Sequence, residues 1–283
     1  MKVGVSGFLP PWHQIARADL DRVRATGLSG AVLRVDDPLN TQDADVVRVK
    51  ALFKQADVSV CQMNGAYECL INPDADLRAR GIAGVTALIR FARLVDAPST
   101  YVRPGSINPA GHWWPHPENH TPRTFDRLVA SMRELCAFAE REGGVLAIEG
   151  HVVSTLDSAK RVKDLMDAVA SPALMFCFDP VNFIGTVADV HATSRVINEL
   201  CDVLGDKFIA AHAKDVKILD AHVVQIVETP PGTGTLDRNL FVKRFNRICP
   251  QGWFMIEHLP DERVPAARLV WGDVAKQVEI TLE

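Results

Sequence analysis

Short hydrophobic runs alternate with amphipathic segments along the whole chain. Eight runs are apolar enough to predict buried β-strands, and they lie at residues 2–8, 30–36, 57–64, 100–105, 144–150, 173–180, 207–214 and 252–258. Between them, apolar residues recur with helical period, most clearly over residues 12–25, 123–142 and 194–204. The pattern therefore predicts strands and helices in regular alternation.

This alternation indicates an α/β fold with a parallel sheet that helices cover. At 283 residues, a closed (β/α)8 TIM barrel fits better than an open doubly wound sheet. The first strand also lacks the G-x-G-x-x-G turn of a dinucleotide-binding fold. Because no linker rich in Pro, Gly or Ser divides the chain, we expect a single domain over residues 1–283.

Four hydrophobic runs in the second half of the chain end in a residue that can bind a metal. The residues are Glu149, Asp179, His212 and Glu257, one at the end of each of the last four predicted strands. A polar group at the edge of an apolar core is costly, and a metal ion makes clustered carboxylates tolerable. Neighbouring strand ends converge on one part of the barrel mouth. The pattern predicts one divalent metal site, with Mn²⁺ favoured and Mg²⁺, Co²⁺ or Zn²⁺ as alternatives.

Three further side chains are expected at the same mouth. His151 and Lys214 each follow a ligand by two residues, so strand alternation places them on the same inward face. His151 is a candidate acid/base or substrate-binding group, with a packed structural histidine as the alternative. Lys214 is expected to neutralise an oxyanion or pair with a carboxylate. Arg103, at the end of the fourth strand, is expected to bind substrate oxygens, with a plain salt bridge as the alternative.

Two long connections complete the expected site. Residues 104–122 contain the candidate substrate-binding residues His112, Trp113, Trp114 and His116. Aromatic faces stack on sugar rings, so this loop is predicted to be a substrate wall or lid, with a dimer contact as the alternative. The connection 216–252 contains an alternating run at 221–227, which is a candidate hairpin, followed by a turn at 230–234.

Composition narrows the choice of partners. The formal net charge is −4 and no long basic run occurs, so we expect neither nucleic acid nor an anionic membrane as a partner. The six cysteines are scattered and predicted to be reduced. No signal peptide or membrane-spanning run is evident, so a cytoplasmic protein is expected. A homo-oligomer or a small accessory subunit remains open.

Several short motifs together resemble the xylose isomerase-like TIM-barrel superfamily of sugar phosphate isomerases and epimerases, which also includes endonuclease IV. The motifs are Ile-Glu-Gly-His at 148–151, Phe-Asp-Pro-Val-Asn at 178–182, His-Ala-Lys-Asp at 212–215, Pro-Gly-Thr-Gly at 231–234 and Ile-Glu-His at 256–258. The resemblance implies that the four candidate ligands bind one divalent metal and that the two glutamates double as acid/base groups. It also makes Asn182 a candidate substrate contact.

Two positions depart from the family pattern. Thr233 stands where the Gly-x-Gly turn commonly carries Glu, and residues 180–182 are Pro-Val-Asn where tagatose-type epimerases have a histidine. These departures argue against a classical ketose 3-epimerase but leave the superfamily resemblance intact.

The expected function is a metal-dependent isomerase or epimerase that acts on a small sugar or keto-sugar through an enediolate. Glu149 and Glu257 would move the proton, with His151 as a further catalytic group. The alternative is a lyase or dehydratase on the same scaffold, eliminating a β-substituent from a keto-sugar or 3-oxo-glycoside. A nuclease like endonuclease IV fits less well, because the chain is acidic and shows a four-ligand pattern.

Overall fold

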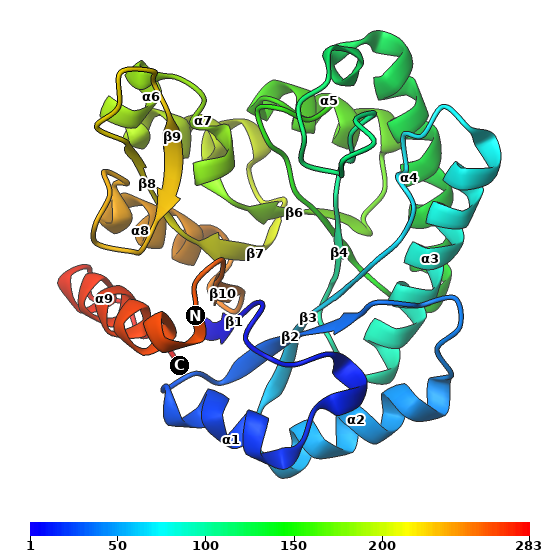
Figure 1. The fold of residues 1–283 in the computed structure, drawn as a ribbon, viewed down its shortest axis with the longest axis horizontal. Coiled ribbons are helices and arrows are strands. Elements are labelled where there is room, and N and C mark those ends of the chain that lie inside the picture. The colour runs from blue at the N-terminus through cyan, green and yellow to red at the C-terminus, as the bar shows by residue number, and fades with distance from the viewer.

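The computed structural model describes residues 1–283 and contains a closed barrel of parallel strands inside a ring of helices (Figure 1). Around the barrel the strands follow the order β1-β10-β7-β6-β5-β4-β3-β2. Their bounds are β1 (Lys2–Val5), β2 (Gly30–Val35), β3 (Ser59–Gly65), β4 (Thr100–Val102), β5 (Leu146–Ile148), β6 (Leu174–Phe178), β7 (Phe208–Ala213) and β10 (Trp253–Ile256). The predicted (β/α)8 barrel is therefore confirmed.

Helices connect successive strands, and the helices predicted over residues 123–142 and 194–204 correspond to α4 and α7. The α-helices are α1 (Arg17–Ala25), α2 (Asp43–Gln55), α3 (Ala75–Leu94), α4 (Pro122–Glu142), α5 (Ala159–Val169), α6 (Val187–His191), α7 (Thr193–Leu204), α8 (Arg238–Ile248) and α9 (Val264–Gln277). Short 3₁₀ helices are η1 (Trp12–Gln14), η2 (Pro117–His120), η3 (Pro180–Phe183) and η4 (Asp261–Arg263). The helix expected over residues 12–25 is divided into η1 and α1, and α1 begins where Asp19 accepts a hydrogen bond from the backbone N–H of Ala16.

A small apolar cluster lies apart from the main core. It consists of Val32, Cys61, Ala147, Cys177, Ala210, Trp253 and Met255, all from barrel strands. Trp253 packs so closely on Gly30 that a Cβ there would lie 2.5 Å from the indole ring. Four cluster members, Ala147, Cys177, Ala210 and Met255, each precede a candidate metal ligand by two residues. Because side chains alternate along a strand, the ligands form the next inward layer toward the mouth.

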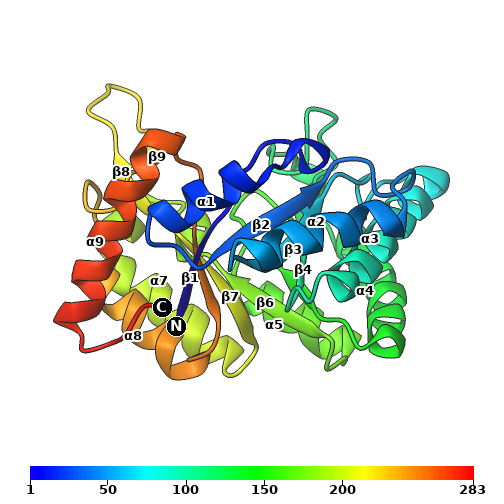
Figure 2. The same cartoon turned by 90° about the horizontal axis from the view of Figure 1, so that it is seen from below.

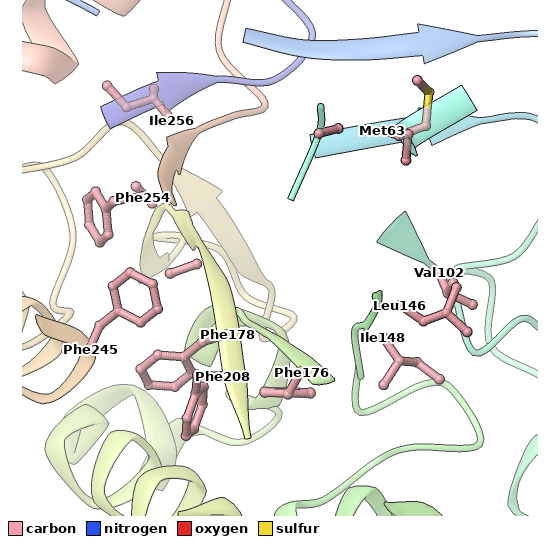
Figure 3. Packing of buried hydrophobic residues seen from close by; sticks show 14 of the residues in the cluster. Met63, Val102, Leu146, Ile148, Phe176, Phe178, Phe208, Phe245, Phe254 and Ile256 are labelled. Carbon is pink, nitrogen blue, oxygen red and sulfur yellow. The ribbon is translucent and has the colours of Figure 1, made fainter. Parts of the chain in front are cut away.

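Aromatic side chains fill the space between the barrel and helices α8 and α9. Phe178 packs against Phe208 with ring centroids 4.7 Å apart, and Phe254 packs against Trp271 at 4.8 Å. Figure 3 shows Phe176, Phe178 and Phe208 close together on the outer side of neighbouring strands. This packing buries the outward faces of strands whose inward faces carry the candidate ligands.

An antiparallel hairpin follows β7, formed by β8 (Asp215–Ile218) and β9 (Ile226–Thr229). Figure 2 shows it projecting at the end of the barrel opposite the N and C labels. The hairpin expected over 221–227 is wrong in position, because residues 219–225 connect β8 to β9 and only the last two residues of the run belong to β9. Val223 and Val224 are 71% and 59% exposed there, so their alternation does not reflect a buried face.

All six cysteines are free thiols, as predicted. None of the helices has the length and apolar character needed to cross a membrane.

Replacing Phe254 by alanine tests the aromatic packing. The side chain is fully buried and contacts Phe241 and Trp271, so we expect a loss of about 3–5 kcal/mol in the free energy of unfolding. Urea denaturation followed by circular dichroism measures it. Leu269→Ala on α9 is the control, because Leu269 is 70% exposed and its loss should change stability by less than about 0.5 kcal/mol. Equal effects of the two substitutions would contradict the packing argument.

Candidate active site

The four candidate ligands meet at the C-terminal mouth of the barrel. Glu149, Asp179 and Glu257 directly follow β5, β6 and β10, and His212 lies near the end of β7. One donor atom from each residue lies within 4.8 Å of the others, and all four side chains are buried. His212 Nδ1 is 2.7 Å from Glu149 Oε1 and 3.2 Å from Glu257 Oε1. The structure thus brings together the residues that the sequence pattern assigned to one site.

Lys214 places its ammonium group among the carboxylates. Its Nζ lies 2.7 Å from Asp179, 2.8 Å from Glu257 and 2.9 Å from Glu228. Burial alone would lower the pKa of this lysine, but the surrounding carboxylates raise it well above its ordinary value. Lys214 is therefore charged, and it neutralises only part of the negative charge at the mouth.

The electrostatics of the carboxylates fit a cation site. Burial raises the pKa of Asp179 to about 7, in spite of the Lys214 ammonium. Burial acts in the same direction on Glu149, but the charges of His212 and Lys214 outweigh it and hold the pKa at about 2. Carboxyl groups this close cannot all remain ionised unless positive charge is added.

Asp179 supplies a second observation in favour of a bound cation. Its Oδ2 is buried and accepts no hydrogen bond, because the contact with Lys214 lacks hydrogen-bond geometry. Its Oδ1 accepts a hydrogen bond from the backbone N–H of Val181 and so caps η3. An oxygen held in this way, next to two further carboxylates and an imidazole, suits Mn²⁺ or Mg²⁺. The residues present therefore fit a divalent ion.

Neighbouring side chains hold the ligands in orientation. Tyr101 donates its hydroxyl hydrogen to Glu149 Oε2, and burial followed by the charge of Glu149 raises its pKa well above the ordinary value. Tyr101 is therefore a neutral phenol. On the other side, His212 Nε2 lies 3.5 Å from Cys177 Sγ, which leaves Nδ1 directed toward the carboxylates. Such outer contacts fix the tautomer and orientation of a metal-ligating histidine.

A cavity of about 710 Å³ opens above the quartet. The predicted site residues that line it are Glu149, His212, Glu257, Arg103, Trp113, His151, Asn182 and Lys214. Asp179 lies beneath it, fully buried. The Trp113 ring lies 5.9 Å from the His151 ring, so the 104–122 loop contributes one tryptophan to the cavity wall. The volume suits a small molecule of sugar size.

Three residues expected from the same loop lie away from this cavity. His112 is directed toward Tyr67, whose carbonyl oxygen lies 3.2 Å from His112 Nε2. His116 caps η2 by accepting from the N–H of Glu118, and Trp114 is 56% exposed. These side chains lie outside the cavity because hydrogen bonds within the protein fix the path of the loop. Asn119 donates to the Ser106 hydroxyl and to the carbonyl oxygen of Val153.

Three site residues were not predicted from the sequence. Tyr101 could have been found, because it precedes Arg103 by two residues and alternation places both inward. Glu228 carried no signal, and His258 was noted only as part of the Ile-Glu-His motif at 256–258. Glu228 lies on β9 and bonds both Lys214 and His258, with His258 Nδ1 2.8 Å from Glu228 Oε2. The position of Glu228 depends on how the β8–β9 hairpin folds over the mouth.

Asp215 anchors that hairpin from inside the protein. Its side chain is fully buried. The carboxylate accepts hydrogen bonds from backbone N–H groups at Val216, Gly232, Gly234 and Leu236 and from the Arg238 side chain. One side chain thus joins β8, the Gly-x-Gly turn and α8.

A family comparison agrees with this architecture. The family model described as xylose isomerase-like TIM barrel matches residues 20–274, so the chain belongs to that family. Among curated proteins, none matches the chain significantly.

Solved structures similar to the chain include three of interest here. A D-tagatose 3-epimerase-like protein has a TM-score of 0.77 at 15% identity, covering 99% of this chain and 98% of its own. A 3-keto-D-glucoside 4-epimerase from E. coli has a TM-score of 0.72 at 16% identity, covering 98% and 99%. A xylose isomerase-like TIM barrel protein from Mycobacterium smegmatis, in complex with magnesium, has a TM-score of 0.75 at 13% identity, covering 98% and 96%. At these identities the similarity is one of fold.

Removing a ligand tests the metal site. We expect the wild-type protein, dialysed against Mn²⁺, to retain a single ion, and Glu149→Gln to weaken Mn²⁺ binding at least about 100-fold because one charged donor is lost. Elemental analysis and isothermal titration calorimetry measure the two quantities. The control is Asp36→Asn, since Asp36 lines the cavity but pairs with Arg34. Wild-type protein without bound metal, or unchanged affinity in Glu149→Gln, would rule out the site.

Proposed function

We propose that the protein is a divalent-metal-dependent isomerase or epimerase of sugars or keto-sugars that works through an enediolate. The observation that carries the proposal is the buried quartet of three carboxylates and an imidazole beneath a cavity at the barrel mouth. The names of two structural relatives, both epimerases or epimerase-like, support a sugar substrate. An ion held by the quartet, for which Mn²⁺ is favoured, would supply Lewis-acid stabilisation of negative charge on a substrate oxygen.

The chain's own carboxylates would transfer the proton. Glu149 and Glu257 follow strands β5 and β10, which are separated in the barrel by β6 and β7. They would therefore face a bound substrate from different sides. One carboxylate would remove the proton from the carbon next to the carbonyl, and the other would return it. Return to the opposite face gives an epimer, whereas return to the adjacent carbon gives an isomer. The Lys214 ammonium can stabilise the negative charge that develops.

A lyase is the second candidate, and the position of His151 favours it. His151 Nδ1 accepts a hydrogen bond from the backbone N–H of Val153, so the ring proton is on Nε2. The ring lines the cavity beside Trp113, and burial lowers its pKa below the ordinary value. A neutral imidazole with a free N–H can donate to a leaving group after the same proton abstraction. The mass of the product separates the two functions.

Incubation with keto-sugars in D₂O tests the proposal. We expect the Mn²⁺-loaded protein to introduce solvent deuterium next to the carbonyl of a ketohexose or a 3-keto-glycoside, with products otherwise unchanged in mass. Glu257→Gln should slow this exchange about 100- to 10,000-fold, because the amide cannot accept the proton. Nuclear magnetic resonance and mass spectrometry of the products measure both effects.

The matched control is Glu262→Gln, because Glu262 is an exposed residue of η4 and its loss should leave the exchange rate unchanged. A lighter, unsaturated product would favour the lyase. Absence of deuterium exchange with neutral and acidic keto-sugars alike would exclude the proposed isomerase or epimerase.

A further inference from the structure

The cationic side chains that line the cavity differ in how their charge is balanced. Lys214 contacts three carboxylates, and Arg34 Nε lies 2.7 Å from Asp36 Oδ1. Arg103 lines the same cavity, yet none of the protein's ion pairs includes it. The neighbouring His112 ring adds no charge of its own, because burial and the charge of Arg103 lower its pKa to about 4. Arg103 is thus a buried cation without an anionic partner.

The guanidinium is nevertheless held firmly in place. Its Nη2 donates to the carbonyl oxygen of Gly65 at 2.8 Å, and its Cζ lies 4.3 Å from the centre of the Tyr67 ring. Tyr67 is itself fixed, because its hydroxyl oxygen accepts the backbone N–H of Arg103. The side chain is 9% exposed, and Nε is buried without a hydrogen-bond partner. Most of its donors therefore remain free in a group that cannot easily swing out to solvent.

The neighbouring strand β5 offers no free carboxylate to pair with Arg103. Val102 of β4 pairs with Ile148 of β5, and Arg103 and Glu149 are the next residues, so they lie at the ends of adjacent strands. Both oxygens of Glu149 are engaged, one by Tyr101 and the other by His212. An unpaired guanidinium at such depth carries a desolvation penalty, which a ligand anion would relieve. The complementary group is therefore missing from the protein and expected on the ligand.

We infer that Arg103 binds a carboxylate of the substrate, so that the substrate is a keto-sugar acid rather than a neutral sugar. This inference rests on the proposed function, since it places the reacting carbon at the metal ligands and the carboxylate beside β4. A guanidinium presents paired N–H donors that match the two oxygens of a carboxylate. A phosphate dianion is a poorer match, because the other cavity cations, Lys214 and Arg34, already have acidic partners. Arg103 thereby sets substrate class without taking part in proton transfer.

Binding of a matched pair of ligands tests the inference. Isothermal titration calorimetry on the Mn²⁺-loaded protein compares D-fructuronate with D-fructose, which differ at the terminal carboxylate. We expect the wild type to bind D-fructuronate at least about 10-fold more tightly, and Arg103→Gln to abolish that preference while leaving the affinity for D-fructose within about 3-fold. Arg34→Gln is the matched control and should keep the preference, because Arg34 is paired with Asp36.

Arg103→Lys provides a second variant in case the glutamine protein does not fold. It retains the charge without the paired donors, so we expect a reduced but measurable preference for the carboxylate. Equal affinities in the wild type, a preference that survives in Arg103→Gln, or tighter binding of D-fructose 6-phosphate that depends on Arg103 would each overturn the inference. Those results would leave deuterium exchange with neutral keto-sugars intact, whereas failure of the proposed function would abolish exchange with every substrate.

Discussion

The structure depends on one electrostatic constraint, which is that three carboxylates lie together in a buried layer at the barrel mouth. Their mutual repulsion is tolerable only with positive charge among them, and Lys214 and His212 provide part of it. The rest of the architecture supports this layer. Apolar residues two positions earlier on each strand fill the barrel below it, and aromatic side chains on the outward faces hold the strands against α8 and α9. The ligands can be close because the strands that carry them cannot move apart.

Much of this arrangement follows from the sequence, because strand alternation is a strictly local rule. The eight hydrophobic runs, the barrel and the convergence of Glu149, Asp179, His212 and Glu257 required no knowledge of tertiary contacts beyond the order of the strands. The same rule correctly placed His151 and Lys214 in the cavity wall.

The remainder could not be predicted, because it depends on how loops fold back over the mouth. Glu228 reaches Lys214 only through the position of the β8–β9 hairpin, and a local alternation of exposed valines suggested the wrong strands for it. The path of the 104–122 loop is set by Asn119, which bonds groups as distant as Val153. This path turns Trp113 toward the cavity and leaves Trp114 in solvent. Contacts of this kind have no periodic signature in the chain.

The five hydrogen-bonding partners of Asp215 have a consequence for how this protein can change over evolution. All of them lie at the base of the hairpin, in β8, the Gly-x-Gly turn and the start of α8, and none lies in the tip at residues 219–225. The tip is therefore free to vary in length and composition while Glu228 stays in place. Insertions at the tip can therefore accumulate without disturbing the buried ligand layer or the position of Glu228.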